Sequence, residues 1–194
     1  LDCEIVATAW DGIIPALLAK KVDVVAASLS ITEDRKRVID FSNKYYQSGA
    51  SIIGPKSMQF GSSPAELDNK IIGLQAASIH VKFAKTYYPN ATIKEYQTQD
   101  EANQDLYSGR IDATQADALT LEAFLQSKEG QACCDLKGMA MNDESLLGEG
   151  IGFGLRKGND ELKSTLNTAI QSLLDSGEYA RISKPYFSFN IYGE

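Results

Sequence analysis

A serine-rich loop that leads into an arginine is the first stretch of this sequence with the chemistry to bind a charged ligand. The loop spans residues 28–35 and follows residues 22–27, a short valine-rich run that is typical of a buried strand. Ser30 and Glu33 have the spacing of a capping box, which predicts a helix that starts just after Ser30. Backbone N–H groups at a helix start, together with the Arg35 guanidinium, suit a carboxylate. In the simpler alternative, Ser30 only caps the helix and Arg35 only pairs with a neighbouring acidic side chain.

A second stretch repeats this arrangement further along the chain. Residues 70–75 are predicted to form a buried strand, and a helix is predicted from Ser78 to about residue 88, before Pro89. Ala76 and Ala77 lie between them, and such small residues let a carboxylate approach backbone N–H groups. The sequence therefore contains two strand–loop–helix stretches with anion-binding chemistry.

Asp117 offers the opposite charge. It lies just beyond a predicted strand at residues 110–114 and just before a predicted helix at residues 118–126. At the carboxyl end of a strand its carboxylate could hold an ammonium group. The alternative is that Asp117 only caps the helix, which is a common task for aspartate.

Two aromatic side chains complete the set of candidates. Trp10 follows a predicted strand at residues 4–8 and precedes a helix with apolar residues at helical spacing. Its ring would favour a flat or cationic ligand side chain. His80 is the only histidine, and we expect it on the exposed surface of its helix because no serine or cysteine partner is indicated.

Strands alternate with helices along the chain, which predicts an α/β fold with parallel-type sheets flanked by helices. Two apolar, glycine-containing runs, residues 49–54 and 149–155, are candidates for strands that cross between two lobes. We therefore expect one lobe at residues 1–48 plus 149–194 and a second at residues 49–148. Ligands of such sheets bind at the carboxyl ends of strands, which places the ligand in a cleft between the lobes.

Composition narrows the class of function. The chain has 194 residues and a formal charge of −7, which argues against nucleic acid as a partner. No apolar stretch approaches the roughly 20 residues that span a bilayer, and the start shows no signal-peptide pattern. Cys133 and Cys134 are adjacent and are either two thiols or a vicinal disulfide. We expect no metal and no cofactor, because no triad, zinc signature or nucleotide loop occurs.

Several motifs together resemble one family. They lie at residues 10–23, 28–35, 39–42, 109–112, 150–157 and 186–193. The sequence is similar to the periplasmic solute-binding proteins of bacterial ABC importers for polar amino acids, and among these to the lysine/arginine/ornithine- and histidine-binding proteins. The resemblance covers essentially the whole chain.

The resemblance implies a type II periplasmic-binding-protein fold, a monomer that closes on a polar or basic L-amino acid or an opine, and a membrane permease as partner. It implies that Arg35, Ser28 and Ser30, assisted by Ser78, bind the α-carboxylate and that Asp117 binds the α-ammonium. It also implies that about 40 residues of the first lobe precede Leu1, with the disulfide partner of Cys3 among them. The implied ligand-binding positions are Trp10, Ser28, Leu29, Ser30, Arg35, Leu74, Ala76, Ser78 and Asp117.

The sequence is also compatible with two other functions. Cyclohexadienyl dehydratases and some cell-wall lytic enzymes resemble the same fold, and fold does not settle function. Such an enzyme would need a carboxyl general acid, for which Glu122 and Asp117 are the candidates. The ligand-binding core of a receptor would require membrane segments or a fused signalling domain, and the sequence contains neither.

Overall fold

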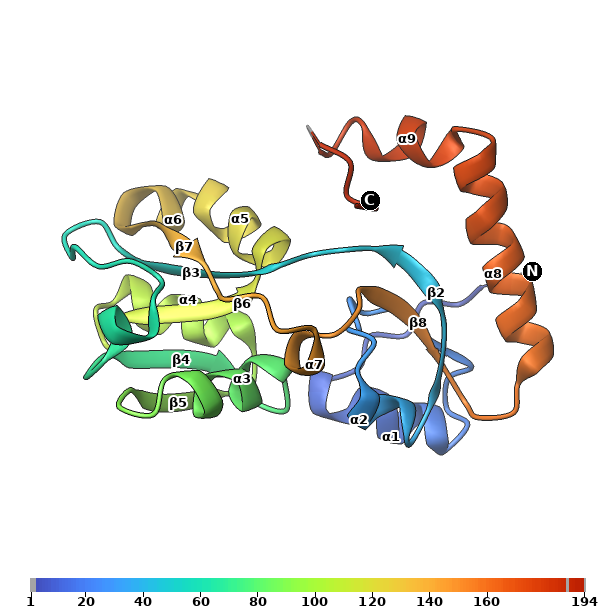
Figure 1. Ribbon diagram of the computed structural model, residues 1–194, viewed down its shortest axis with the longest axis horizontal. Coiled ribbons are helices and arrows are strands. Elements are labelled where there is room, and N and C mark those ends of the chain that lie inside the picture. The colour runs from blue at the N-terminus through green and yellow to red at the C-terminus, as the bar shows by residue number, and fades with distance from the viewer. Residues whose placement is uncertain (1–2, 188, 194) are drawn as a thin grey trace. The chain divides into compact units, whose positions relative to one another are not determined.

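The chain divides into two compact units, as seen in the computed structural model, which describes residues 3–187 and 189–193 (Figure 1). Unit 1 comprises Leu1–Gln47 and Gly148–Glu194, and unit 2 comprises Ser48–Leu147. The backbone therefore passes from unit 1 into unit 2 after Gln47 and returns after Leu147. Among the described residues, no helix combines the length and the apolar character that a membrane crossing requires.

Unit 1 contains a three-stranded sheet. Its order is β1 (Val24–Val25), β8 (Ile151–Leu155), β2 (Asp40–Tyr46), and both pairings are antiparallel. The predicted parallel pairing is therefore wrong for this unit. The reason is topological: β2 leads the chain out to unit 2 and β8 leads it back, so the two strands run in opposite directions.

Helices of unit 1 pack on this sheet and on one another. They are η1 (Trp10–Gly12), α1 (Ile13–Leu18), α2 (Glu33–Lys36), α8 (Asp160–Asp175) and α9 (Glu178–Ser183). The core of the unit is formed by Ile13, Leu17, Val25, Leu29, Ile31, Ile39 and Phe41.

The strand predicted at residues 4–8 is not present. The described residues before η1 form no regular structure, and Ile5 is 97% exposed. A strand needs a neighbour to accept its backbone hydrogen bonds, and the described part of unit 1 pairs no strand with this segment.

Unit 2 contains a five-stranded mixed sheet. Its order is β5 (Thr92–Tyr96), β4 (Ile71–Gln75), β6 (Ala113–Asp117), β3 (Ala50–Pro55), β7 (Cys134–Met139). β4 pairs in parallel with β5 and β6, as predicted, whereas β3 runs antiparallel to both of its neighbours. The carboxyl ends of β4 and β6 thus lie at the same edge of the sheet.

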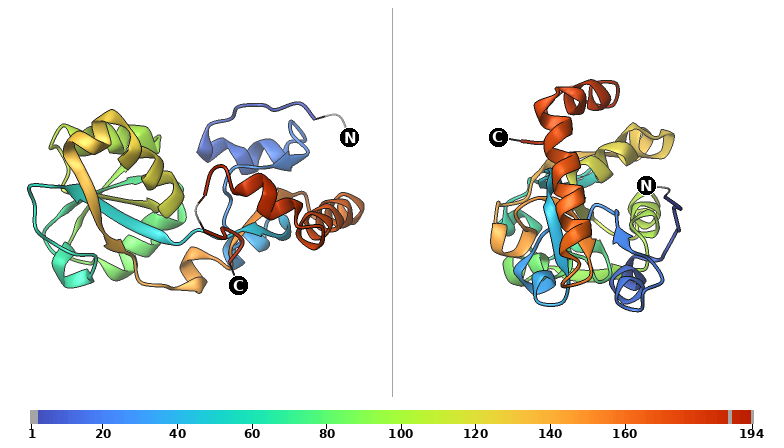
Figure 2. Two further views of the ribbon diagram at one scale, coloured as in Figure 1. Left: turned by 90° about the horizontal axis from the view of Figure 1, so that it is seen from above. Right: turned by 90° about the vertical axis from the view of Figure 1, so that its right-hand side faces the viewer.

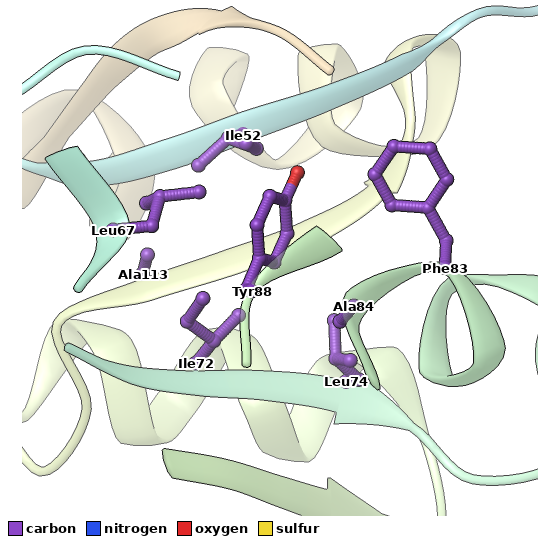
Figure 3. Close-up of a cluster of buried hydrophobic side chains, with 8 residues drawn as sticks. All are labelled: Ile52, Leu67, Ile72, Leu74, Phe83, Ala84, Tyr88 and Ala113. Atoms are coloured by element: carbon purple, nitrogen blue, oxygen red, sulfur yellow. The ribbon is translucent and has the colours of Figure 1, made fainter. Parts of the chain in front are cut away.

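Helices cover both faces of this sheet (Figures 1 and 2). They are η2 (Pro64–Leu67), α3 (Ile79–Tyr87), α4 (Gln99–Tyr107), α5 (Ala118–Gln126), α6 (Lys128–Cys133) and α7 (Glu144–Leu147). On one face, Phe83 and Ala84 of α3 pack on Ile52, Ile72 and Leu74, as Figure 3 shows. On the other, Leu106 of α4 and Leu121 of α5 pack on Ile53, Ile111 and Ala116.

Cys133 and Cys134 form a vicinal disulfide at the junction of α6 and β7. This resolves the two alternatives that the sequence left open. Cys134 is buried against the core on the α4–α5 face of the sheet, and Cys3 is an exposed free thiol.

An ionic cluster around Asp105 ties α4 to β5 and to the loop before β6. The Asp105 carboxylate accepts hydrogen bonds from Arg110 Nε at 2.7 Å, Lys94 Nζ at 2.7 Å and the Tyr96 hydroxyl at 2.6 Å. These bonds, with that from Arg110 the strongest, hold the pKa of Asp105 well below its usual range.

Replacing Asp105 by asparagine is expected to destabilise the protein at pH 6 more than at pH 3. Because its pKa is lowered in the folded protein, the stabilisation is complete above the unfolded value of about 3.9 and is lost as the pH falls below it. Urea denaturation of both proteins at the two pH values measures this difference. The exposed Glu4→Gln variant serves as control, and an Asp105→Asn deficit that is equal at pH 3 and pH 6 would contradict the prediction.

Candidate functional site

In unit 1, the structure brings together three of the predicted residues. Arg35 donates a hydrogen bond from Nη1 to the carbonyl oxygen of Ser30 at 2.9 Å. The guanidinium carbon of Arg35 lies 5.6 Å from the centroid of the Trp10 ring, which is a cation–π distance. Trp10 also packs against the core of the unit. The guanidinium is therefore held by a backbone carbonyl and an aromatic ring.

The helix after this loop is capped by Thr32, and the predicted cap at Ser30 is wrong. α2 starts at Glu33, and Thr32 Oγ1 accepts a hydrogen bond from the Arg35 backbone N–H at 3.3 Å. Ser30 is instead 4% exposed and forms an isolated antiparallel bridge with Ile151 of β8. α2 has only four residues, so the dipole of this helix is weak beside the full charge of the Arg35 side chain.

Each unit has one non-glycine residue in the left-handed region at the loop that follows a strand. Ser28 has φ +52° and Ala77 has φ +58°. Such conformations cost energy for residues with a Cβ and often occur at functional sites. The Ser28 hydroxyl oxygen accepts a 2.5 Å hydrogen bond from the Tyr46 hydroxyl. This hydrogen bond connects Ser28, and with it the start of the loop that contains Arg35, to β2.

In unit 2, Ser78 lies at the start of α3. It occupies the N-cap position, yet its side chain makes no capping bond, and its buried Oγ has no hydrogen-bond partner among the described residues. A buried unsatisfied hydroxyl is costly and unusual. The backbone N–H of Ala76 is already used, because it donates to the Tyr96 carbonyl at 2.8 Å. The Ser78 hydroxyl is therefore the group of this loop that still has hydrogen-bonding capacity to offer.

Asp117 ends β6, and the structure does not show the capping role that was its alternative. It stands at the N-cap position of α5 but makes no side-chain capping bond. Its Oδ1 lies 3.4 Å from Nε2 of His80, and its side chain is 16% exposed. The carboxylate is therefore oriented by a neighbouring helix, α3, and retains some access to solvent.

His80 is buried, so the predicted exposed position is wrong. It is 6% exposed, and its Nδ1 lies 3.3 Å from Nε2 of Gln115. Gln115 Oε1 accepts a hydrogen bond from the Tyr88 hydroxyl at 2.9 Å. Burial raises the pKa of Tyr88, which keeps this hydroxyl protonated and able to donate. A buried polar chain thus runs from Tyr88 through Gln115 and His80 to Asp117.

The sequence contained a signal for this chain. His80 shares a helical stripe with Phe83 and Ala84, which are both fully buried. On β6, Gln115 and Asp117 lie on the same face of the strand as Ala113, which packs under α3. These two periodicities together place His80 against Gln115 and Asp117.

Leu29 and Leu74 are core residues, so the prediction that they contact ligand is corrected for both side chains. Each is fully buried, Leu29 in the core of unit 1 and Leu74 in the cluster of Figure 3. Their predicted places came from strand ends, but their side chains point to the cores. Glu122, a candidate general acid, is exposed on α5 and accepts a hydrogen bond from Gln126 Nε2 at 3.3 Å.

Within the described ranges, no group of three or more histidine, cysteine, aspartate or glutamate side chains is arranged to hold a metal ion. The side chains described above offer charge and hydrogen bonding: Arg35 and the serine hydroxyls can donate to an anion, and the Asp117 carboxylate can pair with a cation.

Residues 1–189 match the model of the bacterial extracellular solute-binding proteins, family 3. The chain belongs to this family. It is 37% identical over 196 residues to the L-arginine-binding protein of Pseudomonas aeruginosa, covering 100% of this chain and 75% of that protein. It is 36% identical over 197 residues to the histidine-binding periplasmic protein of Salmonella typhimurium, covering 99% of this chain and 75% of that protein.

Solved structures agree with this family assignment. An ancestral arginine-binding protein bound to glutamine matches with a TM-score of 0.85 at 32% identity, covering 96% of this chain and 80% of that one. An ancestral amino acid-binding protein, a precursor of cyclohexadienyl dehydratase, matches with a TM-score of 0.82 at 28% identity, covering 95% and 77%. These comparisons confirm the predicted family and the predicted α/β fold class of periplasmic binding proteins.

Proposed function

We propose that this family member binds a polar or basic L-amino acid, or an opine, in the periplasm and delivers it to the membrane permease of an ABC importer. Two relatives are named for arginine and histidine, and one of them is named as periplasmic. The observation that carries the proposal is the family match over residues 1–189. It is supported by two charged side chains with defined neighbours, which are Arg35 in unit 1 and Asp117 in unit 2.

The proposal assigns each charged group of the ligand to side chains of opposite charge. Arg35, with Ser28 and Ser30, binds the α-carboxylate, because a guanidinium is the strongest available partner for a carboxylate. Ser78 contributes the hydroxyl that has no partner among the described residues. Asp117 binds the α-ammonium group.

Trp10 sets the class of ligand side chain in this proposal. Its ring already lies at a cation–π distance from one guanidinium, that of Arg35. A flat or cationic ligand side chain would pack on the part of the ring that Arg35 leaves uncovered. Ala76 contributes only its small size, which leaves room beside Ser78.

An enzyme on this scaffold is not favoured. The family and both relatives are named for solute binding, and the exposed Glu122 is bonded within its own helix. Dehydration of a cyclohexadienyl substrate would need a general acid that contacts the substrate. No observation on Asp117 favours that role over the binding of an ammonium group.

Fluorescence titration tests the proposal, because Trp10 is the only tryptophan of the chain. We expect L-arginine to change its emission with a Kd in the micromolar range or below. Agmatine, which lacks the carboxylate, and 5-guanidinovalerate, which lacks the ammonium, should each bind about 100-fold more weakly. Equal affinity for all three compounds would show that neither charged group is recognised as proposed.

Replacing Ser78 by alanine is expected to weaken ligand binding about tenfold without destabilising the free protein. The variant removes a ligand hydrogen bond but also removes a buried hydroxyl that lacks a partner, so the free protein should be unchanged or more stable by up to about 1 kcal/mol. Calorimetry and thermal unfolding measure the two effects. Ser127→Ala, which removes the cap of α6, is the matched control and should lower stability but leave affinity unchanged. A Ser78→Ala protein with lower stability and normal affinity would refute a ligand-binding role.

A further inference from the structure

The polar chain behind Asp117 determines the tautomer of a neutral, buried imidazole. Gln115 Oε1 accepts from the Tyr88 hydroxyl, so the amide nitrogen of Gln115 points at Nδ1 of His80. An amide nitrogen only donates, and Nδ1 therefore accepts. In this arrangement the hydrogen of the neutral imidazole lies on Nε2, which faces Asp117 Oδ1 at 3.4 Å. His80 thus offers its N–H to the carboxylate that we assign to the ligand's ammonium group.

A second proton on His80 would change this carboxylate's surroundings. Nδ1–H would need an acceptor, which Gln115 supplies only if its amide group turns over and receives a hydrogen bond through Oε1. The Tyr88 hydroxyl can then accept from the turned amide, so the chain has a consistent bonding pattern in both states. The imidazolium would place a positive charge against Asp117 and offset its negative charge in a poorly solvated location.

Several other titratable groups around α3 have partners of their own. On α3, Lys85 pairs with Glu95 of β5 at 2.9 Å, and the Tyr87 hydroxyl donates to Asp143 near α7 at 2.7 Å. On β5, Lys94 pairs with Asp105 at 2.7 Å. Lys82 on α3 and Glu144 on α7 carry the remaining charges of these packed elements, and β4 carries none. Among the groups named here, Asp117 is the one in contact with the imidazole.

We propose that His80 is a positioning residue for the ammonium-binding carboxylate, and that protonation of His80 weakens ligand binding through Asp117. This inference rests on the proposed function, since it deepens the role given to Asp117. Proton and ligand ammonium are two cations that compete for one carboxylate, so each lowers the affinity for the other by the same factor. Tight binding above neutral pH and release on acidification follow from this competition.

The test is calorimetric titration with L-arginine from pH 8 to pH 5.5, a range in which the α-ammonium and the guanidinium of the free amino acid stay predominantly protonated. The wild-type protein is expected to bind about tenfold more weakly at pH 5.5 than at pH 8. His80→Gln keeps an amide donor at the Nε2 position but takes up no proton. It should bind at pH 8 within about threefold of wild type and vary by less than about twofold across the range.

A purely structural role for His80 gives a different result, because the glutamine variant would then keep the wild-type pH slope. A flat wild-type profile, or an unchanged slope in His80→Gln, overturns the inference while binding at pH 8 still supports the proposed function. Absence of wild-type binding at every pH, with L-arginine and equally with lysine, ornithine, histidine, glutamine, glutamate and an opine, overturns the proposed function itself. Asp143→Asn is the matched control near α3, and it should keep the wild-type slope.

Nuclear magnetic resonance supplies a second readout that needs no ligand. His80 is the only histidine, so its imidazole nitrogens give unambiguous signals. At pH 8 we expect a protonated Nε2 and an unprotonated Nδ1, and the Nε2 signal should shift in Asp117→Asn, which removes the negative charge that the Nε2–H faces. The opposite tautomer, or the same Nε2 signal in both proteins, would contradict the contact on which the inference depends.

Discussion

Replacing Arg35 by alanine should weaken binding of the amino-acid ligand by about 100-fold or more. The guanidinium supplies charge-assisted hydrogen bonds to the carboxylate, and losing one partner of such a pair typically costs about 2–5 kcal/mol. The measurement is calorimetric titration of the wild type and the variant with L-arginine and with agmatine. Agmatine has no carboxylate, so its affinity should be nearly the same for both proteins.

Two further variants separate charge from geometry at this position. Arg35→Lys keeps the charge but loses the planar fork that fits a carboxylate and stacks on Trp10, so we expect an intermediate loss. Arg37→Ala, two positions on, removes an exposed side chain that pairs with Asp34 and should leave affinity unchanged. If Arg35→Ala lowers the affinity for L-arginine and for agmatine equally, Arg35 supports the fold of the loop and does not bind the carboxylate.

Replacing Asp117 by asparagine should weaken binding of L-arginine by about 100-fold, since asparagine keeps the size but removes the charge that binds the ammonium group. For 5-guanidinovalerate, which lacks that group, the change should be less than about threefold. Calorimetry with both compounds measures the difference. Glu122→Gln in the following helix changes the charge of unit 2 by the same amount, and we expect it to bind both compounds as the wild type does. Equal losses for the two compounds in Asp117→Asn would rule out the ammonium assignment.

The sequence predicted the features that local patterns determine. The helix predicted at residues 118–126 has those bounds. Parallel pairing was predicted correctly for β4, β5 and β6, because alternating strands and helices impose it locally.

Features that depend on distant partners could not be predicted from local patterns. Ser30 has the sequence of a cap, but its pairing with β8, more than a hundred residues later, moves the cap to Thr32. The antiparallel sheet of unit 1 likewise depends on the return of β8 to β2. The short elements α6, β7 and α7 were not predicted, because polar and apolar residues follow no clear period in residues 128–147.

For the candidate site, residue types were more informative than side-chain directions. Arg35 lies beside Trp10, and the Ser78 hydroxyl has no hydrogen-bond partner among the described residues, but their roles toward a ligand stay predictions. The side chains of Leu29 and Leu74 point into the cores of their units. The prediction that His80 is exposed was wrong because it took no account of the helical stripe that His80 shares with the buried Phe83 and Ala84. The role of His80 depends on its contacts with Gln115 and Asp117, which lie on a strand more than thirty residues further along the chain.

Calorimetric titration of this chain at pH 8 with L-arginine, lysine, ornithine, histidine, glutamine, glutamate and an opine tests the central claim most directly. We predict that one or more of the basic or polar amino acids, or the opine, binds at one site per chain with a Kd in the micromolar range or tighter. We further predict that the preferred ligand loses at least about 100-fold in affinity when its carboxylate is removed. Absence of binding for all seven compounds at millimolar concentration would contradict the claim that this chain binds an amino acid.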